Sequence, residues 1–414
     1  MNSSLQDNRF LKSILVFFVF GSLFPSIHVL LYGTGSSLGV FELFVGLLPE
    51  FFSLCILGIL VYFLIKHSNS SLSIYRFQVF DWIVLSFFIV NIFLGFVIND
   101  NFQHSFNAFR LTYFPVVFYF FGRFHLPIDK YKVYDFCFLI MYWLLGVALI
   151  GILLYFVFPN FMSRMIEWAA GKRLEYSIPR MTSLFWSPSL LAEFMSLGAL
   201  FSFYNIQLKN GWRYYFLFFV FLLCLLFTVS RAPLLIFIMG ILALTSVFKN
   251  WKALLICLAI IITSFFIAWL FVDSIDKSLI WIFSSTLDCI SAKNLLYLKD
   301  LLLESLRHLK SNPLGVGFGK METLTSDSWY LKITYETGII GLLSYLFLVS
   351  THGWMAYQYW KNYKMRMMLF LFLFFVLFNL ESIVRSLPEY FLLSNFYWLS
   401  IGFAQNLIAA KKGK

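Results

Sequence analysis

Charged side chains are scarce in this chain, where Asp, Glu, Lys and Arg make up only 12% of 414 residues. Hydrophobic residues make up 61%, and Phe alone occurs 54 times. One water-soluble core could not bury so much apolar surface, so lipid must be the main solvent of the chain. The few charges gather in breaks between apolar runs, as expected where a charge in hydrocarbon is costly. This scarcity excludes an ordinary soluble domain.

Cysteine and histidine are also rare, with five and six copies. Only Cys289 lies in a long loop, so no disulfide framework is available there. No HExxH or paired His and Cys spacing occurs, and we expect neither a metal nor a cofactor. Basic residues outnumber acidic ones by 31 to 20, but they are scattered over loops, so no nucleic-acid partner is expected.

Long apolar runs are the main feature of the sequence. Most are close to the ~20 residues that an α-helix needs to cross a bilayer. They predict an all-α integral membrane protein with about twelve transmembrane helices, in a single polytopic domain over residues 1–414. The runs are 12–31, 42–65, 80–98, 106–122, 134–158, 186–206, 214–230, 232–248, 253–272, 329–350, 367–384 and 391–409.

Lys and Arg in the short loops predict the orientation. If twelve helices alternate, these cations fall on one side, which the positive-inside rule makes cytoplasmic. Both termini are then cytoplasmic, a bacterial inner-membrane location is expected, and the long loops 159–185 and 273–328 share the opposite, periplasmic or external face, where the functional residues are expected. The cations are Arg9, Lys12, Lys66, Arg76, Arg123, Lys130, Lys132, Lys209, Arg213, Lys249, Lys252, Lys361, Lys364, Arg366, Lys411, Lys412 and Lys414.

The second long loop contains a helical pattern. Leu recurs at helical spacing over 293–310 with cations elsewhere on the wheel, which predicts an interfacial amphipathic helix. Ser311, Asn312 and Pro313 end the pattern. The Gly-rich segment 315–319 that follows lacks the spacing of a phosphate-binding Walker loop and comes after a helix, so we expect a flexible turn.

Several arginines lie at the ends of helices on the predicted periplasmic side. Arg173 and Arg180 precede the span at 186–206, and Arg231 lies in a tight turn between two spans. The planar, permanently charged guanidinium suits a phosphate or diphosphate group. The alternative is that these side chains reach lipid headgroups or satisfy loop carbonyls. The residues alone leave both interpretations open.

Carboxylates near the same side could act as general bases, because partial burial raises the pKa of Asp and Glu towards that role. The candidates are Asp327, Glu193 and Glu336, with Glu193 about one turn into its span. Asp327 could instead cap the helix that follows it. Arg110 and Tyr113 lie inside the fourth span, where a buried polar contact is favoured and Arg110 is kept as a substrate-binding candidate.

Three parts of the chain together resemble the O-antigen polymerase and O-antigen ligase superfamily of membrane glycosyltransferases. The first is Arg180-Met-Thr-Ser-Leu-Phe-Trp-Ser-Pro188, and the second is Ser230-Arg-Ala232. The third is the order Asn312-Pro-Leu-Gly-Val-Gly-Phe-Gly319, Asp327-Ser-Trp-Tyr-Leu331 and Glu336-Thr-Gly-Ile-Ile-Gly341 across one loop-to-helix junction. The resemblance covers somewhat more than the C-terminal half and implies a GT-C-like architecture.

In that superfamily, residues corresponding to Arg180 and Arg231 hold the diphosphate of an undecaprenyl-diphosphate-linked glycan under the large periplasmic loop. Ligases carry a His where this chain has Asp327, a departure that favours the polymerase branch and a catalytic role for Asp327. Tyr330 and Arg307 would line the glycan path. All these roles are implied by the resemblance.

The expected function is metal-independent transfer of a growing glycan from its undecaprenyl diphosphate to the next lipid-linked repeat unit. The arginines would stabilise charge on the departing diphosphate. Asp327, or failing it Glu193 or Glu336, would accept the acceptor's proton. Expected partners are the lipid-linked repeat units and membrane lipid, and they could include a chain-length regulator and a flippase. A ligase that transfers polymer to the lipid A core, a lipid-linked oligosaccharide flippase and a scaffolding protein remain as alternatives.

Overall fold

The structure is a computed structural model, and every element in its described part is a helix. Among these residues, six helices are long and apolar enough to cross a membrane. They confirm an all-α chain with multi-pass membrane character. The total of about twelve spans, the inner membrane and the orientation stay predictions. The described residues are 77–98, 102–125, 130–158, 180–185, 187–209, 211–271, 303, 306–319, 328–383, 385–389 and 391–412.

Most predicted runs within the described residues correspond to one helix each, with starts that agree within a few residues. The runs 12–31 and 42–65 lie outside the described residues. The helices are α3 (Val79–Val97), α4 (Phe102–Thr112), η2 (Phe114–Val116), α5 (Val117–His125), α6 (Lys130–Val157), α8 (Pro188–Lys209), α9 (Trp212–Phe227), α10 (Arg231–Phe248), α11 (Trp251–Phe271), α14 (Trp329–Tyr363), α15 (Arg366–Glu381), η4 (Leu387–Glu389) and α16 (Phe391–Lys412).

The prediction of one continuous span over 106–122 is wrong. α4 ends at Thr112, a short 3₁₀ turn runs through Pro115, and α5 begins at Val117. Proline has no backbone N–H and its ring clashes with the carbonyl of the preceding turn, so a helix breaks there. The apolar run is therefore divided into two short helices.

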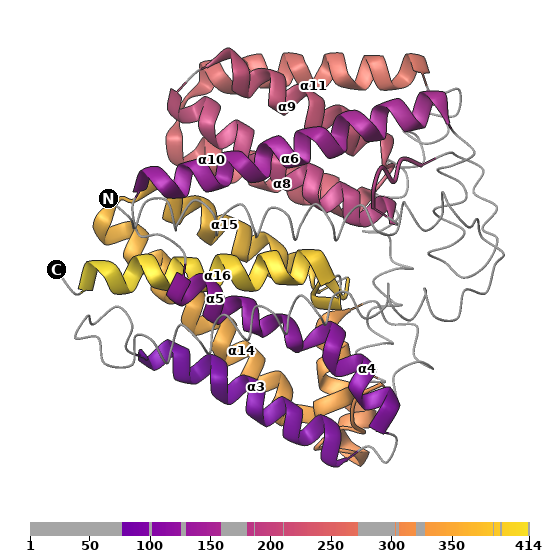
Figure 1. The fold of residues 1–414 in the computed structure, drawn as a ribbon, viewed down its shortest axis with the longest axis vertical. Coiled ribbons are helices and arrows are strands. Elements are labelled where there is room, and N and C mark those ends of the chain that lie inside the picture. The colour runs from indigo at the N-terminus through magenta and orange to yellow at the C-terminus, as the bar shows by residue number, and fades with distance from the viewer. Residues whose placement is uncertain are drawn as a thin grey trace, which may run out of the picture. The chain divides into compact units, whose positions relative to one another are not determined.

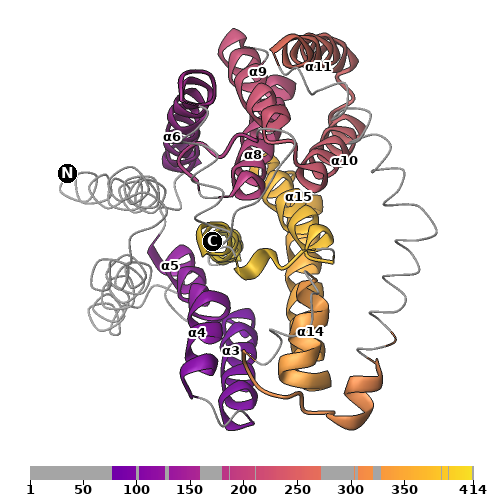
Figure 2. The same cartoon turned by 90° about the vertical axis from the view of Figure 1, so that its right-hand side faces the viewer.

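The chain divides into two compact units. The first unit comprises Met1–Leu48 and Lys130–Ser291, and its described helices are α6 and α8 to α11. The second unit comprises Pro49–Asp129 and Ala292–Lys414, and its described helices are α3 to α5 and α14 to α16. Figures 1 and 2 show the helices of each unit by label. Each unit is described by itself below.

In the first unit, α8 is the central helix. It packs against α6, α9, α10 and α11, and most of its length is buried among them. Two of its buried polar side chains, Ser202 and Asn205, donate to carbonyl oxygens one turn earlier in the same helix. The start of α8 is thereby held in a defined position beside the end of α9.

In the second unit, α5 and α16 cross closely. A Cβ atom at Gly122 would collide with the backbone of Leu399, and one at Gly402 would collide with the backbone of Tyr119. Small residues at helix crossings are typical of membrane bundles, because they let the two backbones approach. The crossing lies beside a buried ion pair.

That ion pair corrects the prediction that Arg123 lies in a short cytoplasmic loop. Arg123 belongs to α5, its side chain is fully buried, and its Nε lies 3.2 Å from Oδ1 of Asp81 on α3. The Tyr119 hydroxyl also donates to Asp81. A buried charge needs an oppositely charged partner, and the Asp81 carboxylate is that partner for Arg123 inside the bundle.

α14 contains a sharp turn at Gly338, whose φ is +66°. The rings of Trp329 and Tyr345 lie 5.7 Å apart, although a straight helix would separate these residues by about 24 Å. Residues 329–337 therefore fold back towards residues 339–345. The run predicted as one span over 329–350 is a short helix followed by a long one that continues to Tyr363.

Candidate functional site

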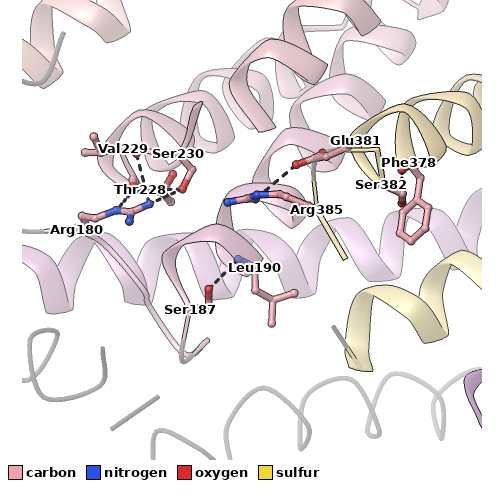
Figure 3. Close-up of polar contacts among 10 residues, drawn as sticks. All are labelled: Arg180, Ser187, Leu190, Thr228, Val229, Ser230, Phe378, Glu381, Ser382 and Arg385. Carbon is pink, nitrogen blue, oxygen red and sulfur yellow. Dashed lines mark hydrogen bonds and ion pairs between the residues drawn. The ribbon is translucent and has the colours of Figure 1, made fainter. Parts of the chain in front are cut away.

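In the first unit, the Arg180 side chain is hydrogen-bonded to the turn between α9 and α10. Its Nε donates to the carbonyl oxygen of Thr228 at 2.9 Å, and its Nη2 donates to Ser230 Oγ at 2.9 Å and to the carbonyl oxygen of Val229 at 3.4 Å (Figure 3). Thr228 is the C-cap of α9 and Ser230 is the N-cap of α10. One guanidinium therefore contacts the whole connection between the two helices.

The turn itself has an unusual backbone. Val229 has a φ of +52°, in the left-handed region that a β-branched residue rarely adopts. The Thr228 hydroxyl donates to the Leu225 carbonyl at 2.6 Å, and the Met181 N–H donates to the Phe227 carbonyl at 3.0 Å. Such strain persists only where the surroundings determine the conformation, and it is concentrated at functional sites.

Arg231 is the first residue of α10 and is partly exposed. The structure therefore brings Arg180 directly onto the turn that precedes Arg231, although the two residues are far apart in the sequence. The expected tight turn is confirmed over 228–230, whereas residues 231–233, which were expected to belong to it, open α10. The alternative role of an arginine, satisfaction of loop carbonyls, is confirmed for Arg180.

Glu193 lies in α8, about one turn beyond Pro188 as predicted, and only 6% of its surface is exposed. The segment before α8 is itself buried over 181–185, where the Ser183 hydroxyl donates to the Val147 carbonyl at 2.6 Å. Glu193 is thus a carboxylate inside an apolar helix, an expensive arrangement that usually has a function. Arg173 lies outside the described residues.

In the second unit, Glu336 is fully buried at the turn in α14. Its Oε1 accepts the Gly319 N–H at 3.0 Å and lies 3.9 Å from Lys332 Nζ. Within the described part of the chain, no donor reaches its second carboxylate oxygen. Glu336 therefore has a hydrogen-bonded oxygen that positions it and a second oxygen that can accept a proton.

The Gly-rich segment is an anchored turn, so the prediction of flexibility is wrong. Gly315, Gly317 and Gly319 all have positive φ, at +86°, +87° and +78°. The Gly317 N–H donates to the Glu336 carbonyl at 2.9 Å, and the Phe318 N–H donates to the Gly95 carbonyl at 3.1 Å. Only glycine adopts these angles without strain, and the bonds to α3 and α14 fix the segment.

The helix cap differs from the prediction. Ser328, a buried residue, is the N-cap of α14, so Asp327 does not hold that position. Asp327 itself lies outside the described residues, and its catalytic role stays a prediction. Tyr330 is half-buried, and its hydroxyl donates to the Asn379 carbonyl at 3.5 Å.

Two further candidates lie on other helices. Arg307 is exposed on the helical segment 306–311, where the amphipathic pattern ends, and the rest of 293–310 is almost wholly outside the described residues. The backbone of Arg110 is part of α4 and its side chain is not described. The buried polar contact expected near Arg110 is confirmed for Tyr113, whose hydroxyl donates to Asn91 Oδ1 at 3.3 Å.

The sequence interpretation missed Arg385. Its Nη1 lies 3.5 Å from Oε1 of the buried Glu381 (Figure 3), and its side chain is 23% exposed. The Trp329 N–H donates to the carbonyl oxygens of Ser382 at 3.0 Å and Arg385 at 3.4 Å. The spacing of Glu381 and Arg385 by one helical turn was a signal that could have found the pair.

Comparison with known proteins finds no matching family model and no similar curated protein.

Proposed function

We propose that the chain is a polysaccharide polymerase of the O-antigen type, which transfers a growing glycan from undecaprenyl diphosphate to the next lipid-linked repeat unit. The proposal depends on one observation above all. Arg180 donates to the turn that ends at Ser230, and Arg231 follows immediately. The two cations that the resemblance pairs in diphosphate binding thus belong to one small region of the first unit.

The chemistry of this region suits a departing diphosphate. The acceptors described for Arg180 include a hydroxyl and two carbonyl oxygens of the turn, which orient the guanidinium. Arg231 lies at the N-terminus of α10, where the helix dipole adds partial positive charge. Preorganised charge of this kind stabilises a developing anion without reorganisation during the reaction.

A base for the acceptor hydroxyl is the second requirement. Asp327 is the first choice from the resemblance, with Glu193 and Glu336 as the other candidates. Glu336 is preorganised by Gly319 through one oxygen, and this arrangement would allow the other oxygen to accept a proton. No metal or cofactor takes part in the proposed reaction.

The test is the ladder of surface polysaccharide from cells that lack the gene, complemented with wild type, Arg180→Gln or Arg231→Gln at matched protein levels. Arg213→Gln is the matched control, because Arg213 is exposed at the other end of α9. We expect the deletion cells to show core with a single repeat unit. The two site variants should fail to restore the ladder and the control should restore it fully.

Other outcomes would replace the proposal. Bare core together with long lipid-linked polymer would indicate a ligase. Loss of all periplasmic repeat units, with lipid-linked units retained on the cytoplasmic side, would indicate a flippase. An intact ladder in the deletion cells would exclude both glycosyl-transfer functions, and full restoration by both site variants would exclude the assigned diphosphate site.

A further inference from the structure

A fully buried amide in the second unit belongs to none of the sequence motifs. Asn91 lies in α3 and has no exposed surface. Its Nδ2 donates to the Phe87 carbonyl at 2.8 Å and to Ser344 Oγ at 3.1 Å. Its Oδ1 accepts from the hydroxyls of Thr337 at 2.9 Å and Tyr113 at 3.3 Å. A side-chain amide offers two donor positions and two acceptor positions, so all four positions of Asn91 are used.

Two of these partners lie on either side of the turn in α14. Thr337 ends the short segment 329–337, and Ser344 belongs to the long segment that follows the turn. Asn91 is therefore bonded to both segments at once. The packing is close as well, because a Cβ atom at Gly341 would collide with the Thr337 hydroxyl and would lie 2.8 Å from Asn91 Oδ1. The bonds and the packing hold the two segments together.

The Gly-rich segment is bonded to the same short segment of α14. A helix that reverses leaves backbone carbonyl groups without their usual partners, and in a membrane other donors must replace these partners. The Val316 N–H donates to the Tyr335 carbonyl at 3.1 Å, and the Gly317 N–H donates to the Glu336 carbonyl at 2.9 Å. The Gly319 N–H donates to Glu336 Oε1 at 3.0 Å. These bonds depend on the direction of the short segment, which Asn91 helps to fix.

We infer that Asn91 is a positioning residue for the candidate base Glu336. It joins the two segments of α14 and thereby keeps Glu336 against the Gly-rich segment. The inference rests on the proposed function and selects Glu336 among its three candidate bases. Support of a buried carboxylate from two sides is expected for a group that must accept a proton at a defined place. A displaced base slows the chemical step more than it weakens substrate binding.

Asn205 in α8 of the first unit is the matched control. It is also fully buried, and its Nδ2 donates to the Phe201 carbonyl one turn earlier at 2.8 Å, as that of Asn91 does to Phe87. Within the described residues, no donor reaches Oδ1 of Asn205. Leucine is close to asparagine in size, so the two Asn→Leu variants differ mainly in the bonds to neighbouring segments that are lost.

The first experiment measures hydrogen exchange in the purified full chain, in nanodiscs of phosphatidylethanolamine and phosphatidylglycerol. Asn91→Leu should raise the exchange rate of the peptide that contains residues 315–319 by about tenfold, because the N–H groups of this peptide are bonded to the short segment of α14. Asn205→Leu should leave the exchange of this peptide unchanged.

Milder variants keep this test independent of the folding of Asn91→Leu. Thr337→Val with Ser344→Ala leaves Asn91 in place and removes its bonds to both segments of α14. This double variant should also raise the exchange rate of the peptide. Tyr113→Phe removes a bond of Asn91 to a residue outside α14 and keeps the aromatic ring, so it should have a smaller effect.

The second experiment measures chain elongation by the same proteins on lipid-linked repeat units extracted from the deletion cells. Asn91→Leu should lower kcat by about tenfold to a hundredfold and change KM by less than about twofold. Glu336→Gln should lower kcat at least as much. Adding Asn91→Leu to Glu336→Gln should cost little more, because the two residues act as one unit, whereas a merely structural role would add its full loss. Asn205→Leu should change neither constant.

Three outcomes would overturn the inference. These are unchanged exchange in both Asn91→Leu and the double variant, equal acceleration by Asn205→Leu, or an unchanged kcat in a protein whose exchange is accelerated. Failure of the inference is distinct from failure of the proposed function, because hydrogen exchange requires no turnover. A missing ladder in deletion cells with unchanged exchange would keep the polymerase and reject the role of Asn91. Accelerated exchange with an intact ladder would reject the polymerase and leave Asn91 as a support of the turn.

Discussion

Arg123 in the second unit and Arg180 in the first show two ways in which a membrane protein uses a guanidinium. Arg123 has no exposed side-chain surface and is paired with the carboxylate of Asp81. Arg180 is partly exposed and binds the carbonyl and hydroxyl oxygens of a turn. The first charge is compensated inside the bundle and stabilises the fold, whereas the second is positioned against a turn by bonds that include neutral oxygens. Arg385, partly exposed and paired at 3.5 Å, is intermediate.

The largest effect on stability is expected at the buried pair. Arg123→Gln should lower the free energy of unfolding by about 3–5 kcal/mol, because it leaves the Asp81 carboxylate buried without its cation. Chemical unfolding of the purified protein in detergent measures this loss. The double variant Asp81→Asn with Arg123→Gln should recover part of it, since no unpaired charge remains. If the double variant lost as much free energy of unfolding as the two single variants together, Asp81 and Arg123 would not compensate each other's charge.

Arg180→Lys should have a smaller effect on stability and a larger one on function. Lysine keeps the charge but loses the planar fork that contacts both Thr228 and Ser230, so we expect a loss of about 1–2 kcal/mol in the free energy of unfolding. The polysaccharide ladder should nevertheless be strongly shortened. Arg213→Lys serves as the exposed control. A full ladder from Arg180→Lys would mean that charge alone, without the fork, is sufficient at this site.

The smallest effect is expected at the strained turn itself. Val229→Gly removes a β-branched residue from a φ of +52°, which offsets the loss of its buried side chain, and stability should stay within about 1 kcal/mol of wild type. Val220→Gly, in the middle of α9 and equally buried, has no strain to relieve and should cost about 2–4 kcal/mol. Equal losses from the two variants in thermal unfolding would show that the turn stores no strain.

The sequence predicted the helices well where one apolar run forms one helix, as in α3, α8 and α11. It failed at Pro115 and Gly338, although both residues were visible, because run length alone does not separate a continuous span from two shorter helices. Local patterns also assigned Ser328's capping position to Asp327. The errors at Pro115 and Gly338 concern how a run is divided and not whether it is apolar.

Contacts between residues that are distant in the sequence were harder to predict from the sequence. The pairing of Asp81 with Arg123 depends on how α3 and α5 pack, which no local spacing encodes. The association of Arg180 with the turn before Arg231 was anticipated only through the family resemblance. Arg385 was missed because it lies in the short connection between α15 and α16, outside the two long loops that the apolar runs indicate.

The reversal at Gly338 gives the second unit a half-helix. Residues 339–363 alone extend for about 37 Å, more than the ~30 Å hydrocarbon thickness of a bilayer, so residues 329–337 are not needed for crossing. The N-terminus of the short segment, the positive end of its dipole, therefore points into the body of the unit at the level of Tyr345. Discontinuous helices in transporters use the same geometry to attract anions towards the middle of the membrane. The dipole of the short segment would thus attract an anion towards the interior of this unit and not only to its surface.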